Sequence, residues 1–119
     1  MKRSHLPSAS LSANDVERVQ KELTLGFLNL SEGFFSQAQM NFEIVLQIDK
    51  ACADAHWGLM LAKFQIKNED ELSTNPVQFK EVTDSLECKN ALELADENLK
   101  NIYFSLLENI NKINEGENY

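Results

Sequence analysis

Apolar residues recur every three or four positions over most of the chain, which is the spacing of an α-helix with one buried face. The first such stretch runs from Asn14 to about Gly33, the second covers residues 35–48, and the third covers about 53–66. Asn14 with Glu17 predicts a capping box, and Gly33 suits the left-handed conformation that ends many helices. The third stretch is apolar on every side, so we expect it at the centre of the fold.

Residues 68–84 interrupt this period. Asn68 can cap one short helical turn, and Asn75-Pro76 ends it because the residue before proline avoids the helical conformation. The apolar residues beyond it alternate, which weakly favours an extended segment. Three of them are the expected anchors: Val77, Phe79 and Val82. The segment is therefore interpreted as an irregular insertion.

The helical period returns at Ser85 and stays nearly in phase to Ile113. One helix of that length would project beyond so small a domain. Asp96 is suited to cap a new helix, with Glu97 favourable in its first turn. We therefore predict two helices over residues 85–114, with one continuous helix as the alternative.

The length of 119 residues suits one domain, and only four Gly and two Pro argue against an all-β fold. The predicted class is all-α: a helix-turn-helix array of about five helices, with an irregular insertion and a long C-terminal capping helix. The predicted parts are a flexible tail (1–13), one helical domain (14–114) and a frayed end (115–119). Within the domain, residues 14–67 carry the repeat described below.

Charge and cysteine content restrict the partners. The formal net charge is −8, and an acidic protein repels the phosphate backbone, so we expect no nucleic acid. No apolar run approaches the ~20 residues of a membrane span, and the first 13 residues lack the apolar run of a signal peptide. Two cysteines are too few for a disulfide framework. We expect a cytoplasmic protein with free thiols.

Few residues suggest chemistry. Cys52 and His56 lie four residues apart on one helical face, but with Cys88 they do not complete a four-ligand zinc site. The chain has no phosphate-binding Gly-Lys-Ser/Thr loop, and the acidic run at 69–71 is typical of a solvated surface rather than a catalytic pair. We expect no metal, no cofactor and no enzymatic activity.

An internal repeat links the first and third helical stretches. A shift of 34 residues aligns Leu23 with Trp57, Leu25 with Leu59, Phe27 with Leu61, Leu28 with Ala62 and Leu30 with Phe64. A 34-residue period with a helix pair in each unit is typical of tetratricopeptide repeats. The chain resembles that family in further motif residues: Leu25, Gly26, Gly33, Phe35, Ala38, Phe42, Val45 and Leu46.

The resemblance covers residues 14–67 and then loosens. Lys50 stands where the family usually has proline, and the period puts Pro76 where an aromatic residue is expected. An insertion of roughly 19 residues restores the register, with Ala91 and Ala95 in the roles of Ala38 and Phe42. The later part is similar to uncharacterised bacterial tetratricopeptide-like proteins over residues 67–72 and 89–96.

The resemblance implies a protein-interaction or scaffold function, because the first helix of each repeat in this family lines a concave groove for a partner. The groove residues carried over by position are Leu23, Phe27, Leu30, Asp54, Trp57, Leu61 and Phe64, with Gln20, Thr24, Gly58 and Gln65 beside them. The family members that clamp a carboxylate use basic and Asn residues that are absent here. An amphipathic helix is therefore the expected ligand, with Trp57 as anchor.

Two alternatives stay open. A stripe at helical spacing is also what core residues produce, so the final helix could fill the groove itself. The final helix could instead pair with a second copy through Leu106 and Ile110, which would make the chain a structural, self-associating domain.

Overall fold

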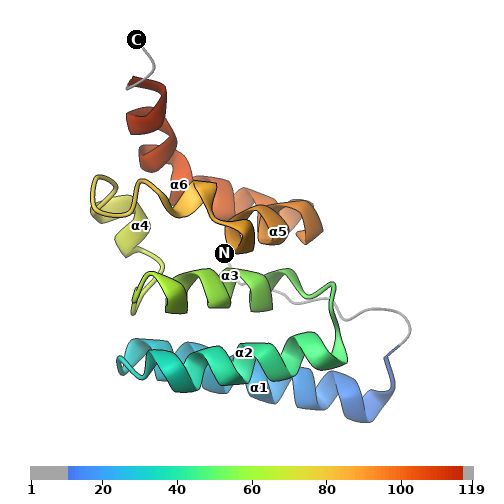
Figure 1. Cartoon of the computed structure of the whole chain (residues 1–119). Helices are drawn as coiled ribbons and strands as arrows, with labels where there is room; N and C mark the ends of the chain where they lie inside the picture. The colour runs from blue at the N-terminus through green and yellow to red at the C-terminus, as the bar shows by residue number, and fades with distance from the viewer. Residues whose placement is uncertain (1–10, 117–119) are drawn as a thin grey trace.

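The computed structural model describes residues 11–116, which form helices joined by turns and contain no strand (Figure 1). The helices are α1 (Ala13–Ser31), α2 (Phe35–Ile48), α3 (Ala53–Lys63), α4 (Glu71–Thr74), α5 (Leu86–Leu94) and α6 (Glu97–Gly116), with a 3₁₀ turn, η1 (Val82–Asp84). The predicted all-α class is confirmed, with one more helix because the turn expected after Asn68 forms α4. Within residues 11–116, no helix is both long and apolar enough to cross a membrane.

The helices are stacked in layers with α3 in the middle (Figure 1). α1 and α2 form a hairpin on one side of α3, and α5 and α6 lie on the other side, with α4 at one edge. α3 is buried on both flanks, as the distribution of apolar residues around it predicts. Its buried residues are Ala53, Asp54, Ala55, Trp57, Gly58, Met60, Leu61 and Ala62.

The two ends of α1 differ in how well the sequence predicted them. Ser12, not Asn14, is the N-cap, and its hydroxyl accepts a hydrogen bond from the Asp15 N–H at 3.1 Å. The capping box expected at Asn14 is therefore wrong, because the helix begins before Asn14 and Ser12, two residues earlier, accepts from one of its free amides. Gly33 follows α1 with φ of 82°, the left-handed conformation predicted for it.

The insertion is a run of turns rather than an extended segment. Val82 is fully buried in η1 and Phe79 is 7% exposed, so both anchor the insertion as predicted. Val77 is 70% exposed, and its assignment as an anchor is wrong. The alternation did not correspond to a strand, because the chain turns here: the Val82 N–H donates a hydrogen bond to the Phe79 carbonyl at 3.0 Å, just before η1.

The predicted break near Asp96 is confirmed. α5 ends at Leu94, and the Asp96 carboxylate accepts a hydrogen bond from the Leu99 N–H at 2.8 Å as α6 begins. α6 continues to Gly116, past the expected limit at 114. Most of the predicted tail, residues 1–10, and the end of the chain, residues 117–119, lie outside the described residues.

Phe42 of α2 holds the first three helices together. Its ring lies against Gly26 of α1 and Gly58 of α3, and a Cβ added at Gly26 would come within 2.6 Å of it. A Cβ at Gly58 would come closer still. The prediction that put Gly58 beside the groove is therefore wrong, because its surface faces Phe42. Phe27 completes the contact with its ring edge-on to Phe42, 5.1 Å between centroids.

Candidate functional site: the contact between α3 and α6

The seven predicted groove residues divide into a buried and a partly buried set. Leu23, Leu30, Asp54, Trp57 and Leu61 are buried, whereas Phe27 and Phe64 are partly buried. The buried residues of α3 include the expected anchor Trp57, whose side chain is 0% exposed. An open groove centred on Trp57 is therefore not what these residues form.

Trp57 is covered by Tyr103 of α6. The two rings are stacked with 4.1 Å between centroids and 12° between planes. The indole Nε1–H donates a hydrogen bond to the Glu69 carboxylate at 2.8 Å. Both the face and the polar edge of Trp57 are thus satisfied within the chain, which is what a buried tryptophan requires.

Asp54 forms the polar part of the same contact. The Tyr103 hydroxyl donates a hydrogen bond to Asp54 Oδ1 at 2.5 Å, and both side chains are buried. A buried carboxylate is costly unless it is hydrogen-bonded. The Tyr103 side chain therefore fixes α6 on α3 in two ways, through its ring on Trp57 and through its hydroxyl on Asp54.

α6 buries one full face and also contacts the insertion. Its buried residues are Leu99, Tyr103, Leu107 and Ile110. The Asn109 amide donates to the Ser73 carbonyl at 2.9 Å, and the Asn114 amide donates to the Lys80 carbonyl at 3.2 Å. These contacts hold the second half of α6 on residues 73–80.

The sequence left open whether the final helix fills the apolar surface around Trp57. α6 lies on the α3 part of the predicted groove because its apolar stripe is complementary to the apolar surface around Trp57. Ile110 is 0% exposed and Leu106 is partly buried, so the stripe considered for self-association is largely used inside the chain.

Sequence reasoning missed Glu69 and Tyr103 as members of this site. Glu69 was assigned to a solvated acidic run, but its carboxylate reaches Trp57 from 12 positions along the chain. Tyr103 lies in the apolar stripe of α6, and a tyrosine there needs a polar partner. That requirement was the available signal, although the sequence could not show that Asp54 would meet it.

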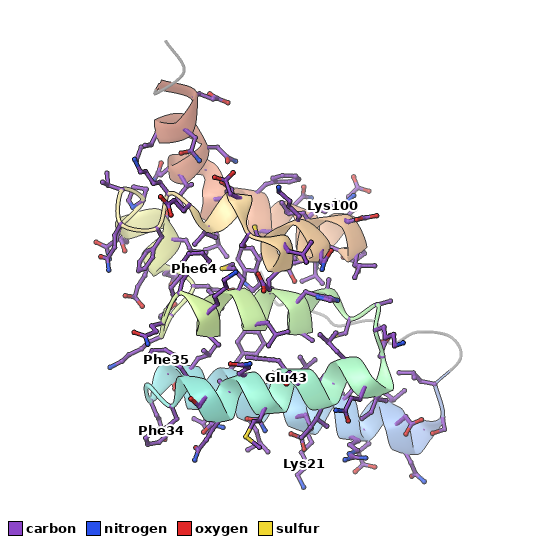
Figure 2. The ribbon with its side chains drawn as sticks, in the orientation of Figure 1. Lys21, Phe34, Phe35, Glu43, Phe64 and Lys100 are labelled. Carbon is purple, nitrogen blue, oxygen red and sulfur yellow. The ribbon has the colours of Figure 1, made fainter. Side chains whose placement is uncertain are left out.

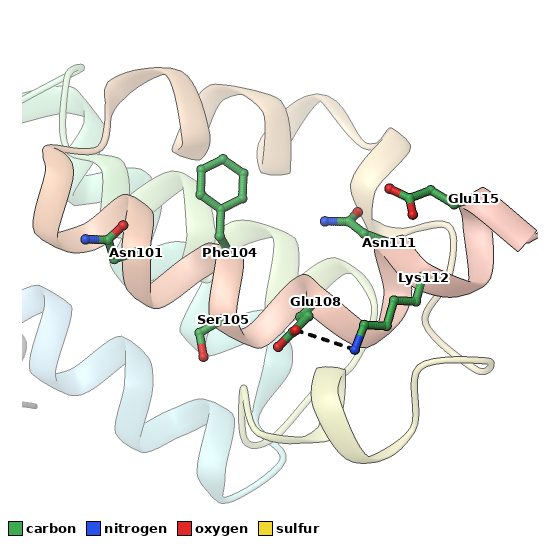
Figure 3. Close-up of a pocket in the computed structure, with 7 residues that line it drawn as sticks. All are labelled: Asn101, Phe104, Ser105, Glu108, Asn111, Lys112 and Glu115. Atoms are coloured by element: carbon green, nitrogen blue, oxygen red, sulfur yellow. Dashed lines mark ion pairs between the residues drawn. The ribbon is translucent and has the colours of Figure 1, made fainter.

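The opposite face of α6 is a shallow hollow that is open to solvent and lined mainly by polar residues (Figure 3). Phe104 stands on it, 50% exposed, and Lys112 pairs with Glu108 at 3.5 Å. The other lining residues are Asn101, Ser105, Asn111 and Glu115.

Cys52, His56 and Cys88 are the residues that were considered for metal binding. Both cysteines are free and buried, and burial raises the pKa of Cys52 to about 12 and that of Cys88 to about 11. His56 Nε2 lies 3.1 Å from the Lys50 carbonyl oxygen. Within residues 11–116, no group of three or more His, Cys, Asp or Glu side chains is placed to hold a metal ion.

No protein-family model, curated protein or solved structure matches this chain. The role of the contact between α3 and α6 is therefore inferred from its own geometry.

Proposed function

We propose that the protein is a non-enzymatic interaction module related to tetratricopeptide repeats, and that its α3 face accepts an amphipathic helix. One observation carries the proposal: an amphipathic helix, α6, already occupies this face through Tyr103. The face thus has the apolar surface and the polar groups that such a ligand needs. In the free protein α6 fills the site, and a partner helix takes its place.

The contacts of Tyr103 define the partner. An aromatic ring is needed to cover Trp57, and a hydroxyl donor is needed for Asp54. Further apolar residues at helical spacing would replace Leu99, Leu107 and Ile110. The expected partner is therefore an amphipathic protein helix with a tyrosine in its apolar stripe. The proposal puts the protein in the cytoplasm, where free thiols such as Cys52 and Cys88 stay reduced.

The connection to α5 allows such an exchange. Ala95 and Asp96 alone separate the end of α5 from the start of α6, so α6 can leave as one unit while α5 stays on α3. A ligand inside the same chain competes at high effective concentration. A free peptide should bind the wild-type chain weakly and should bind better once the α6 contact is weakened.

The test uses a labelled synthetic peptide with the sequence of residues 97–116. We expect it to bind the Tyr103→Ala variant at least about tenfold more tightly than the wild type, because the variant loses both the ring and the hydroxyl that hold α6. Tyr103→Phe keeps the ring, and its affinity for the peptide should lie between those of the wild type and Tyr103→Ala. Phe104→Ala, on the exposed face of the same helix, is the matched control and should behave as wild type.

Fluorescence of Trp57 provides a second readout, because it is the only tryptophan. In the wild type its emission should be protected from acrylamide, and protection should fall in Tyr103→Ala and return when peptide is added. Circular dichroism verifies that each variant is folded. A folded Tyr103→Ala variant that fails to bind the peptide would overturn the proposal.

A further inference from the structure

α1 carries a second apolar stripe on the side away from its core. Leu25 is 37% exposed and Leu28 is 51% exposed, whereas the core stripe of α1 consists of Val19, Leu23, Gly26 and Leu30. Lys21, four residues before Leu25, and Glu32, four residues after Leu28, extend the exposed stripe at its two ends. We call Lys21, Leu25, Leu28 and Glu32 the outer seam of α1.

The outer seam has the spacing of a coiled-coil interface. Its residues follow one another at intervals of four, three and four, which is the alternation of a and d positions in a heptad. Figure 2 shows Lys21 on the side of the α1–α2 hairpin that faces away from α3, with Phe34 at the hairpin turn near the same edge. Phe34 is 51% exposed and Met40 of α2 is 64% exposed, so further apolar surface lies on this hairpin.

The charges of the outer seam are complementary in only one arrangement of two helices. If a second α1 lies antiparallel with the two-fold axis between Leu25 and Leu28, then Leu25 faces Leu28 of the other copy. In the same register Lys21 faces Glu32 of the other copy, and the symmetry repeats each pair. A parallel arrangement would instead place Lys21 against Lys21 and Glu32 against Glu32.

Both charged groups of the outer seam are uncompensated within the described part of the chain. Lys21 and Glu32 are exposed, and neither side chain has an ion-pair or hydrogen-bond partner among residues 11–116. Glu32 is also the C-cap of α1, where the helix dipole disfavours a negative charge. A lysine from an antiparallel neighbour would relieve that unfavourable position.

We propose that the outer seam of α1 binds a second copy of this chain, forming an antiparallel, two-fold symmetric dimer with Leu25 and Leu28 at its centre and a Lys21–Glu32 ion pair at each end. The seam is short, so the dimer is weak and depends on concentration. This interface lies on the opposite side of the molecule from α6, so both could be occupied together.

Analytical ultracentrifugation over a dilution series tests the dimer. We expect the wild-type chain to associate as concentration rises. Lys21→Glu and Glu32→Lys should each weaken association at least about tenfold, because each single change places like charges together at both ends. An equimolar mixture of the two variants should associate again as a heterodimer, and so should the double variant Lys21→Glu/Glu32→Lys.

Two further variants separate this interface from others. Leu28→Asp should abolish association, while circular dichroism should remain that of the wild type because Leu28 is outside the core. Lys112→Glu changes the same charge on the exposed face of α6 and should have no effect. A wild-type chain that stays monomeric throughout would overturn the proposal. So would association that survives both single charge reversals, or that Lys112→Glu removes.

Discussion

At the scale of single residues, two glycines make room for the aromatic ring that joins the first three helices. Gly26 and Gly58 have no Cβ, and the ring of Phe42 occupies the space where those atoms would lie. Dispersion contacts of this kind are individually small and collectively large. Gly26 was among the motif residues that carried the family resemblance. Phe42 and Gly58 lie 16 positions apart in the chain, and the packing of α2 on α3 brings them together.

Gly58→Ala tests this packing. Overpacking a filled core costs about 1–3 kcal/mol, and the gain in helix propensity from Gly to Ala returns up to about 1 kcal/mol. We expect the free energy of unfolding, measured with urea, to fall by about 1–2 kcal/mol.

The same substitution in a Phe42→Leu background should be neutral or stabilising, because the smaller side chain leaves room for the methyl group. Gly116→Ala is the control, since nothing lies within 4 Å of a Cβ at that position. An equal loss in both backgrounds would show that contact with Phe42 is not the cause.

The candidate site was predicted only in part from the sequence, and the reason lies in its individual residues. Trp57 and Asp54 were identified from their positions in the repeat, but their exposure was not predictable. The exposure of Trp57 and Asp54 depends on Tyr103, which lies 49 positions from Asp54, and on where α6 packs. Long-range contacts of this kind are set by tertiary packing, and local periodicity carries no information about them.

At the scale of elements, helix positions were more predictable than helix ends. The apolar period located α1, α2 and α3, and the break between α5 and α6 followed from Asp96. The error at the start of α1 arose because Ser12, Asn14 and Asp15 are all good capping residues in one short stretch. The insertion was the region predicted least well, because its fold depends on where Phe79 and Val82 pack against the core.

Asp96→Ala should loosen α6 without removing it. The Asp96 carboxylate accepts from the Leu99 N–H, and loss of such a cap typically costs about 1 kcal/mol. Hydrogen exchange should therefore become faster in the first turns of α6 and remain unchanged in α1 and α2. Glu93→Ala, which removes an exposed carboxylate from α5, is the matched control. Equal acceleration in both variants would rule out capping as the explanation.

At the scale of the whole molecule, the layered arrangement follows from one sequence property. α3 is apolar on all sides, so it needs partners on two flanks, and the α1–α2 hairpin and the α5–α6 pair supply them. The sequence predicted that central position. It did not decide between an open groove and a filled one, because both give the same apolar stripe.

The buried thiols make global stability sensitive to alkaline pH. Burial raises the pKa of Cys88 from 9.0 to about 11 and that of Cys52 from 9.0 to about 12, so the folded state holds both protons more tightly than the unfolded state. Below pH 9 the thiols leave stability unchanged. As pH rises from 9 to about 11 and 12, the unfolded thiols ionise first and the free energy of unfolding falls.

Urea unfolding at a series of pH values measures this effect. Between pH 9 and about 11, Cys88→Ala should lose stability less steeply than the wild type, because one of the two titrating thiols is gone. The other ionisable groups are common to both proteins and cancel in the comparison. Parallel slopes would contradict a burial effect on Cys88.

The position of Phe42 between two glycines also has a consequence for how this chain can change over evolutionary time. A methyl group at position 26 or 58 is accommodated best with a smaller side chain at position 42, so the effects of substitutions at these three sites depend on one another. In any divergent descendant of this sequence, we expect substitutions at the three positions to be correlated. That three-site correlation would mark descendants in which the same helices pack in the same way, even after the apolar period itself has drifted.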